Sequence, residues 1–352
     1  MVLNDYPRSM MKENFIIVDG CLKVKKIFIV AEIGSNHCQD INLAFDLIDA
    51  AKDCGADAVK FQSLSLDDQY YRPSKEIISL FKKINLKEDW VVKLKKYSDR
   101  RKIVFFSSPT YLKAVDLLED AGVEIYKLAS AQVSTFPQLV KKVAKLNKPI
   151  LLSSGLVNRK ELTEVVSLIR RTGNRKLVIL HCNSIYPTPY KKVNLNLIKT
   201  YQELFNGPVG FSDHSRDIFM PIAAAALGAM VIEKHFMLDK KNISPDRNIS
   251  LLPRQFKNMT EGIRDVETGL GNAERVCLEP EENSFKSKII HRLVLKNDKK
   301  INEPFRSSDF DFKRYSLGID CRQESEISKN FKARNDLKKG TLLTRHKIMP
   351  RV

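Results

Sequence analysis

The sequence predicts an α/β protein, a (β/α)8 TIM barrel followed by a small, mostly β C-terminal domain. Three observations predict this fold class. Short apolar runs rich in β-branched residues alternate eight times with helical patterns, and each run ends in a cluster of polar residues. No G-x-G-x-x-G sequence follows the first run, which disfavours the main alternative, a doubly wound open sheet with a dinucleotide site.

The strands are predicted at short apolar runs that stand between turn signals. Nearly continuous apolar character is typical of parallel strands that are covered on both faces. The expected strands are residues 27–34, 58–63, 103–109, 125–130, 149–155, 177–183, 209–215 and 230–236. The C-terminal ends of all barrel strands open on one face, and this face carries the active site.

The helices are predicted where apolar residues recur three and four positions apart, with a glycine near the end. The clearest examples are residues 41–56, 111–122, 136–147, 159–173 and 254–271. The last of these should complete a barrel domain over residues 1–271. Residues 272–288 are polar and lack apolar periodicity, so we expect a linker there, with the small C-terminal domain over residues 289–352.

Composition indicates a soluble globular protein with a large core, since 43% of the 352 residues are hydrophobic and 29% are charged. No apolar run approaches the roughly 20 residues that span a bilayer, and residues 1–14 lack the apolar centre of a signal peptide. We therefore expect a cytoplasmic protein without a membrane partner. The six cysteines are scattered and include no C-x-x-C pair, so neither a disulfide framework nor a zinc knuckle is indicated.

The chain is strongly basic, with 60 Lys and Arg against 42 Asp and Glu. Residues 285–352 hold 18 basic and 8 acidic side chains, which supply +10 of the net charge of +18. Nucleic acid, anionic lipid or a small anionic substrate could each bind to such a positively charged protein. No RNA-recognition motif or helix-turn-helix is found, so no nucleic-acid partner is expected.

Two lysines, Lys60 and Lys127, stand inside otherwise apolar strands, where an unpaired ammonium would be costly to bury. With the hydroxyls of Ser130, Ser153 and Ser212, they could form a cradle for phosphate and carboxylate at the open face of the barrel. The alternative is that each lysine pairs with a neighbouring strand-end glutamate and only supports the barrel rim.

Two histidines, His214 and His235, end consecutive predicted strands and could point at one metal ion. Two imidazoles with oxygen ligands and open positions suit an octahedral divalent ion better than a closed zinc site. Core histidines or a general base remain the alternatives for this pair.

Glu32 and Asp246 could hold sugar hydroxyls or move a proton, with salt bridges to a lysine as the alternative. His37 and His181 could make hydrogen bonds to a substrate or could be structural.

The motifs AEIGSNH, AVKFQ, YKLAS, ILLSSG, LHCNSIYPTPY, GFSDHS and IEKHFMLDK, in this order, resemble the sialic acid (N-acetylneuraminate) synthase family. The resemblance covers about residues 26–272. It implies a transferase that joins phosphoenolpyruvate to N-acetylmannosamine and releases phosphate by C–O cleavage. Residues 309–320 and 333–343 resemble the antifreeze-like (SAF, β-clip) domain that ends these synthases.

The resemblance also implies substrate contacts. The residues that match the phosphoenolpyruvate-binding positions, with one polar neighbour, are Lys60, Lys127, Ser130, Ser153, Ser212 and Ser184. The residues that match the amino-sugar positions are Glu32, Tyr186 and Asp246.

The implied cofactor is a divalent metal held by His214 and His235, Mn²⁺ first, with Mg²⁺ or Co²⁺ as alternatives. In this family the C-terminal domain of one subunit covers the barrel mouth of the other in a domain-swapped homodimer and donates an arginine. Arg314 matches that arginine.

Two departures from the family pattern leave the acceptor sugar open. Arg247 and Leu252 replace a frequent His and Glu, and Tyr315 and Ser316 follow Arg314 where the family usually has Pro and Gly. The alternatives within the family are a pseudaminic or legionaminic acid synthase that uses a 2,4-diacetamido-trideoxy hexose, the use of N-acetylmannosamine 6-phosphate, and a spore-coat or capsule polysaccharide synthase. A non-catalytic carbohydrate-binding scaffold is the alternative from another class.

Overall fold

The structure, a computed structural model, describes residues 15–18 and 21–351. These residues divide into two compact units, with the boundary between Gly271 and Asn272. The two units are described separately below.

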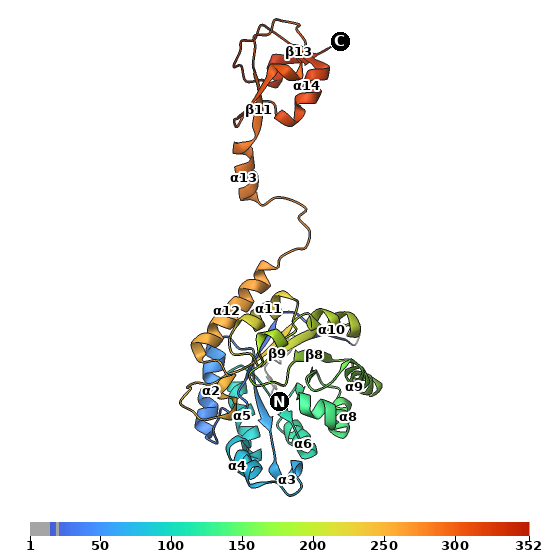
Figure 1. The fold of residues 1–352 in the computed structure, drawn as a ribbon, viewed down its shortest axis with the longest axis vertical. Coiled ribbons are helices and arrows are strands. Elements are labelled where there is room, and N and C mark those ends of the chain that lie inside the picture. Colours follow the sequence, from blue (N-terminus) through green and yellow to red (C-terminus); the bar gives the residue numbers. More distant parts are fainter. Residues whose placement is uncertain (1–14, 19–20, 352) are drawn as a thin grey trace, which may run out of the picture. The chain divides into compact units, whose positions relative to one another are not determined.

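Eight parallel strands form the centre of the first unit and nearly close into a barrel, which confirms the predicted fold class (Figure 1). Hydrogen-bonded neighbours follow the order β5-β4-β3-β10-β9-β8-β7-β6, and β5 lies against β6 without such a ladder. The strands are β3 (Phe28–Glu32), β4 (Ala58–Ser63), β5 (Val104–Pro109), β6 (Tyr126–Leu128), β7 (Ile150–Ser153), β8 (Leu177–Cys182), β9 (Val209–Asp213) and β10 (Val231–His235). Each strand lies inside the run predicted for it.

Helices surround this barrel on the outside (Figure 1). They are α2 (Ile41–Asp53), α3 (Leu66–Gln69), α4 (Lys75–Ile84), α5 (Glu88–Arg100), α6 (Leu112–Asp120), α7 (Ser130–Thr135), α8 (Pro137–Lys145), α9 (Arg159–Arg171), α10 (Leu197–Phe205), α11 (Phe219–Ala226) and α12 (Pro253–Gly269). The helices predicted from periodicity correspond to α2, α6, α8, α9 and α12. Local sequence explains the start of α9, where Asn158 and Glu161 form a capping box.

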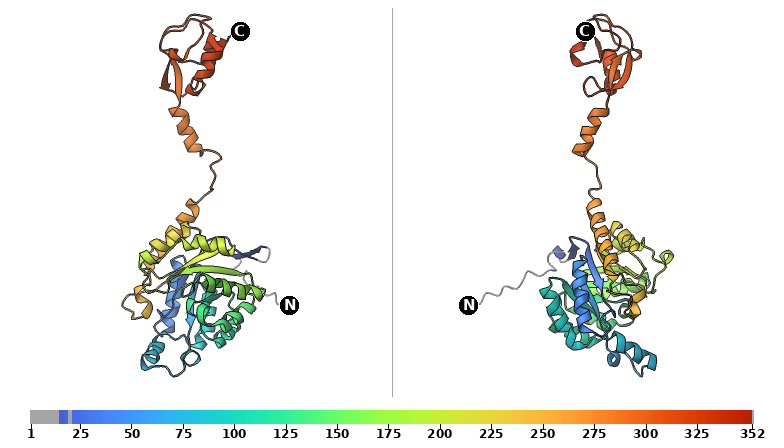
Figure 2. Two further views of the ribbon diagram at one scale, coloured as in Figure 1. Left: turned by 45° about the vertical axis from the view of Figure 1, so that its right-hand side comes forward. Right: turned by 90° about the vertical axis from the view of Figure 1, so that its left-hand side faces the viewer.

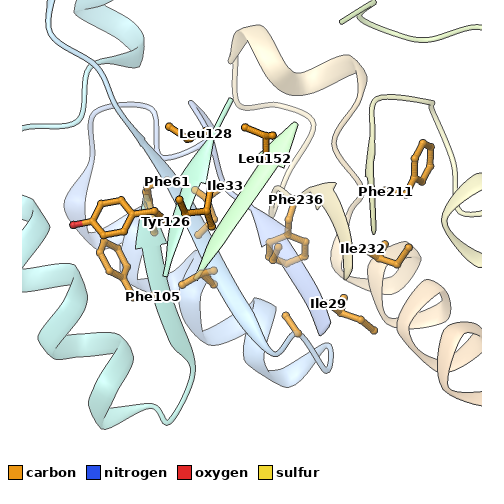
Figure 3. Close-up of a cluster of buried hydrophobic side chains, with 14 of the residues drawn as sticks. Ile29, Ile33, Phe61, Phe105, Tyr126, Leu128, Leu152, Phe211, Ile232 and Phe236 are labelled. Carbon is orange, nitrogen blue, oxygen red and sulfur yellow. The ribbon is translucent and has the colours of Figure 1, made fainter. Parts of the chain in front are cut away.

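Side chains alternate between the two faces of each barrel strand. The residues that fill the inside of the barrel are Phe28, Val30, Ala58, Val104, Phe106, Ile125, Leu151, Val178, Leu180 and Val231. The other face packs against the helices and carries Ile29, Phe61, Phe105, Phe211 and Ile232, which Figure 3 labels. This alternation also decides whether a polar side chain at a strand end points into the barrel or toward the helices.

An antiparallel hairpin, β1 (Phe15–Val18) and β2 (Cys21–Val24), precedes the barrel and is drawn in dark blue in Figure 2. Phe15 and Leu22 are buried and join the apolar cluster inside the barrel. The Phe15 ring packs edge-on against Phe28 at the start of β3, so the hairpin closes the end of the barrel opposite the strand C-termini. The hairpin was not predicted, although the sequence Asp19-Gly20 between its strands is typical of two-residue hairpin turns.

The second unit has a small apolar core of its own, which includes Leu293, Phe305, Phe310 and Ile327. Its elements are α13 (Pro280–Ile289), β11 (His291–Leu295), β12 (Phe310–Arg314), α14 (Glu324–Asn330), β13 (Phe331–Ala333) and β14 (Ile348–Pro350). β11 pairs with β12, and β13 pairs with β14, both antiparallel. The small β-sheets predicted for the C-terminal part are confirmed.

Helix α13 falls in the segment that the sequence predicted to be a linker. None of its residues is buried, and the signals that form it are local. Pro280 stands in the first turn, Glu279 and Glu282 form a capping box, and Lys286 and Lys288 lie near the negative end of the helix dipole. Apolar periodicity therefore could not reveal this helix. Across residues 15–18 and 21–351, no helix combines the length and apolar character that a membrane crossing requires.

Candidate active site

Strand alternation gathers polar side chains above the apolar core of the barrel. The predicted site residues on inward-facing positions at or near strand C-termini are Glu32, Lys60, Lys127, Ser153, Ser212 and His235. All six are buried. They lie at the C-terminal face, which is where barrels of this kind carry their active sites.

Glu233, on β10, connects the two buried lysines. Its Oε1 atom lies 3.1 Å from Lys127 Nζ and 3.7 Å from Lys60 Nζ, and it accepts a hydrogen bond from Ser212 Oγ at 2.9 Å. Lys60 Nζ also lies 2.7 Å from Glu32 Oε2. Both lysines are thus paired with glutamates on other strands, which was the alternative to an anion cradle in the sequence analysis. They also belong to one polar cluster with Ser212.

The pKa values in this cluster follow from burial and from the lysines. Burial alone would raise the pKa of Glu233, but Lys127 and Lys60 outweigh burial and lower it to about 2. For Glu32, burial outweighs the opposing effect of Lys60, and the pKa is raised. Glu233 therefore stays ionised at neutral pH, whereas Glu32 is the carboxyl group better suited to exchanging a proton.

Glu233 was not among the predicted site residues. It stands two positions before His235 on one strand, and residues two apart share a face of a strand. This spacing was the signal in the sequence that could have added Glu233 to the site.

Hydroxyl groups crowd the backbone of Gly155, which follows β7. A Cβ atom at this position would lie 2.5 Å from Ser130 Oγ and 2.6 Å from Ser184 Oγ, so a larger residue would have to push these hydroxyls aside. The hydroxyls of Ser153 and Ser184 are buried and find no hydrogen-bond partner among the described residues. Buried polar atoms without partners are costly, so this part of the barrel mouth is suited to a polar ligand.

The two predicted metal ligands lie side by side. The ring centroids of His214, directly after β9, and His235, at the end of β10, are 5.4 Å apart. His214 Nδ1 lies 2.7 Å from the carbonyl oxygen of Asn183, to which it donates. His235 Nδ1 is buried without a hydrogen-bond partner. Burial lowers the pKa of His235 to about 3, so its imidazole is neutral at pH 7, the form that binds metals.

Loop residues add a carboxylate and an aromatic ring to the histidine pair. Asp246 lies in a short 3-10 helix, Pro245–Asn248, and its Oδ2 atom is 3.8 Å from His235 Nδ1. Ser35 holds this carboxylate with its backbone N–H and its hydroxyl, at 2.9 and 2.7 Å. The ring of Tyr186 packs on His214 with centroids 4.3 Å apart, although most of Tyr186 remains exposed.

The neighbouring imidazoles of His214 and His235 suit a divalent cation that keeps open coordination positions, with the Asp246 carboxylate nearby. Mn²⁺ accepts imidazole and carboxylate ligands. The Nδ1 atom of His235 makes no hydrogen bond among the described residues, so it is available to bind a metal ion. Within the described part of the chain, no group of three or more His, Cys, Asp or Glu side chains could hold a metal ion in its present arrangement. A cation here would therefore need water or substrate among its ligands.

His37 and His181 are buried against aromatic side chains. The His37 ring contacts Phe61 and Trp90 in the layer between strands and helices. His181 follows Leu180, which points into the barrel, so alternation directs its ring outward onto Phe211. These contacts favour the structural interpretation of both histidines over substrate binding.

Arg314, the remaining predicted site residue, belongs to the second unit. It ends β12 opposite His291, and its side chain is exposed. The contacts described above all lie within the first unit.

Comparison with known proteins identifies the family of this site. The model of the NeuB family matches residues 47–275. N,N'-diacetyllegionaminic acid synthase from Campylobacter jejuni is 35% identical over 330 residues, which cover 88% of this chain and 98% of that protein. Pseudaminic acid synthase from the same species is 33% identical over 333 residues, which cover 91% and 96% of the two chains.

Solved structures agree with the sequence relatives. The N-acetylneuraminic acid (sialic acid) synthetase from Leptospira borgpetersenii, solved in complex with citrate, superimposes with a TM-score of 0.71. It is 30% identical and covers 77% of this chain and 96% of its own. The chain belongs to the NeuB family.

Proposed function

We propose that this chain is a nonulosonic acid synthase that condenses phosphoenolpyruvate with N-acetylmannosamine and releases inorganic phosphate. The observation that carries the proposal is the meeting of Lys60, Lys127 and Ser212 at one point inside the barrel mouth. Two buried ammonium groups with hydroxyl donors suit a ligand that bears both a phosphate and a carboxylate.

Phosphoenolpyruvate would take the place that Glu233 now fills as the partner of the lysines. In this arrangement Lys60 and Lys127 donate hydrogen bonds to the substrate in place of some of their contacts with Glu233. The hydroxyls of Ser153 and Ser184, which have no other partner among the described residues, add neutral donors, as does Ser130 beside Gly155. Such a cradle holds the substrate in a fixed orientation and balances its charge.

The amino sugar would bind on the more open side of the mouth. Tyr186 is exposed there, and the carboxyl groups of Asp246 and Glu32 can accept hydrogen bonds from sugar hydroxyls. The raised pKa of Glu32 suits it to handing a proton to the aldehyde oxygen as that oxygen becomes a hydroxyl.

The reaction forms one C–C bond and one C–O bond to water, and it breaks the C–O bond that links C2 to the phosphate. C3 of phosphoenolpyruvate attacks the aldehyde carbon of the open-chain sugar. The new C–C bond is made from the π electrons of the enol double bond. Water adds to the oxocarbenium carbon at C2, and the tetrahedral product loses inorganic phosphate as its C2–O bond breaks. The lysines stay with the phosphate throughout, so they stabilise the leaving group.

His214 and His235 would hold the divalent cation, Mn²⁺ in the first instance. When bound, the cation supplies Lewis-acid polarisation of the aldehyde oxygen.

The second unit would act as an antifreeze-like domain that covers the barrel mouth of a partner subunit in a homodimer. Arg314 would add its guanidinium to the phosphoenolpyruvate site of that partner. Its exposed position at the end of β12 leaves the guanidinium available to another chain.

A 2,4-diacetamido-trideoxy hexose is the second candidate for the acceptor. The observation that favours it is the similarity, over about nine tenths of the chain, to proteins named as legionaminic and pseudaminic acid synthases. Arg247 and Leu252, which depart from the pattern of sialic acid synthases, lie in or directly after the loop that holds Asp246.

The decisive experiment measures phosphate release from phosphoenolpyruvate with Mn²⁺ and four acceptors in parallel. The acceptors are N-acetylmannosamine, its 6-phosphate and the two 2,4-diacetamido hexoses that lead to legionaminic and pseudaminic acid, with mass spectrometry of the product. We expect release with one acceptor and its loss on chelation. A folded chain that binds phosphoenolpyruvate but reacts with none of them would contradict the proposed acceptors, and a chain that does not bind phosphoenolpyruvate would contradict the reaction.

A further inference from the structure

One ion pair near the barrel mouth is fully buried yet faces away from the site. Lys234 Nζ donates to Asp213 Oδ2 at 2.6 Å, and the two side chains are 0% and 1% exposed. Ile232 and Phe211, two positions earlier on the same strands, pack against the helices, so alternation directs Lys234 and Asp213 outward as well. The reaction proposed above uses neither residue.

The ion pair joins the ends of the two strands that carry the histidine pair. Lys234 and Asp213 are direct neighbours in the ladder between β10 and β9. Asp213 immediately precedes His214, and Lys234 immediately precedes His235. A displacement of one histidine relative to the other would therefore stretch the ion pair.

Asp213 also closes the turn on which His214 stands. Its Oδ1 atom accepts the backbone N–H of Ser215 at 2.9 Å, and its Oδ2 atom accepts the hydroxyl of Ser215 at 2.8 Å. Lys234 Nζ donates a further hydrogen bond to the carbonyl oxygen of Ser215. The residues on both sides of His214 are thus tied to β10 through Lys234.

Stability alone does not account for charges in this place. Desolvation of a buried ion pair often costs more than the attraction returns, and apolar side chains of similar volume can replace such a pair without loss. An apolar pair could not provide the directed hydrogen bonds that fix the turn around His214.

We propose that Lys234, Asp213 and Ser215 form a positioning network that sets the separation of His214 and His235 and thereby the affinity of the barrel mouth for a divalent cation. The inference rests on the proposed function, because it takes the two histidines as the cation ligands. Lys234 is a positioning residue, since it contacts neither the substrates nor the cation. Loss of a group that hydrogen-bonds a metal ligand typically weakens metal binding about 10- to 100-fold. We expect an effect of this order from a network that fixes the backbone beside both histidines.

The test measures Mn²⁺ binding by the full chain and by its Lys234→Met variant. Methionine keeps an unbranched side chain, one atom shorter than that of lysine, and removes its charge. Titration calorimetry and electron paramagnetic resonance of free Mn²⁺ report the affinity without any turnover. We expect binding about 10- to 100-fold weaker in the variant. The KM for phosphoenolpyruvate should change little, because the network does not touch Lys60 or Lys127.

A matched control removes an ion pair at the other end of the barrel. Arg264 on α12 lies 2.7 Å from Asp57, which precedes β4. Arg264→Met should lower the free energy of unfolding and leave Mn²⁺ affinity unchanged. This comparison separates a positioning role from general destabilisation.

The outcomes distinguish the inference from the proposed function. A folded Lys234→Met chain that binds Mn²⁺ as tightly as the wild type would overturn the inference alone. If that variant does not fold, Asp213→Asn, which preserves side-chain shape, takes its place, and unchanged Mn²⁺ affinity there would overturn the inference as well. A wild-type chain that binds phosphoenolpyruvate but no Mn²⁺ would overturn the cation site of the proposed function, and the inference with it.

Discussion

Lys127 provides the sharpest test of the anion cradle at the scale of single residues. It is buried, and Glu233 is its partner in the structure. In Lys127→Ala, the phosphate or carboxylate of phosphoenolpyruvate loses a charge-assisted hydrogen bond worth about 1.5–3 kcal/mol. We expect kcat/KM for phosphoenolpyruvate to fall about 10- to 100-fold in steady-state assays. Lys142→Ala, which removes an ion pair with Asp116 on the outer helices, is the control. Wild-type efficiency in Lys127→Ala would contradict the cradle.

Replacing Glu233 should have the opposite effect on anion binding, which we expect to become stronger. In Glu233→Gln, the two lysines lose the carboxylate that balances them and keep more positive charge for a ligand. The variant should be less stable than the wild type without anions, because a buried charge loses its partner. Inorganic phosphate should then stabilise it more, which a thermal shift titration with phosphate measures against the wild type. An equal or smaller shift in the variant would refute this role of Glu233.

His37 supplies a prediction for the pH dependence of stability. Burial lowers its pKa from 6.5 to about 4 in the folded chain. Between these values the unfolded chain binds a proton that the folded chain does not, so stability is lost as pH falls below 6.5. The loss from this residue is at most about 3 kcal/mol between pH 7 and pH 4.

Replacement by asparagine removes this titration and keeps an acceptor for the N–H of Gln39, which His37 Nδ1 now accepts. Urea unfolding of both chains from pH 7 to pH 4 isolates the effect. We expect the unfolding free energy of His37→Asn to fall less steeply than that of the wild type. Parallel curves would show that His37 is not held neutral by the fold.

At the scale of elements, the strands were predictable because burial on both faces leaves a continuous apolar signal. The predicted alternation of one helix with each strand does not hold between β4 and β5, where the chain forms α3, α4 and α5. Hairpin β1–β2 was missed because it stands outside the strand and helix alternation that guided the prediction.

The site was predictable to the extent that it lies on strands. Lys60, Lys127 and His235 follow the alternation of their strands, and so does Glu233, whose position the prediction did not use. Ser184, Tyr186 and Asp246 lie in connections that have no period, so only resemblance to a family could indicate them. His181 shows that a position at the end of a strand is not enough to predict a site residue. A shift by one residue along the strand directs the side chain toward the helices instead of the barrel mouth.

The connection after β7 gives a prediction at this scale, because it brings Gly155 against the start of α7. In Gly155→Ala, the new methyl group would displace the hydroxyls of Ser130 and Ser184. We expect KM for phosphoenolpyruvate to rise clearly. Gly173→Ala, at a position where a Cβ meets nothing within 4 Å, is a control for the loss of glycine, although its positive φ carries a strain of its own. An unchanged KM in Gly155→Ala would exclude these hydroxyls from the substrate site.

At the scale of the whole molecule, the proposed dimer predicts complementation between two variants that are each impaired on their own. Arg314→Ala removes a residue of the second unit, and Lys127→Ala removes one of the first. If Arg314 serves the partner's barrel, a mixed dimer contains one site with both residues intact. Mixing the variants should restore part of the activity, up to about a quarter of the wild-type value for random exchange between equal amounts of the two chains. No recovery despite subunit exchange, verified by mass spectrometry, would contradict the shared site.

Among the described residues, the barrel of the first unit is open at the C-terminal ends of its strands and filled with apolar side chains at the other end. Apolar side chains fill its interior below Lys60 and Lys127, and Phe15 and Leu22 close the opposite end. Reactants and products must therefore pass through the same opening, and whatever occupies the deepest position is the first to arrive and the last to depart. If phosphoenolpyruvate binds at the lysines and the amino sugar near Tyr186, as proposed, this geometry predicts an ordered addition in which phosphoenolpyruvate binds first.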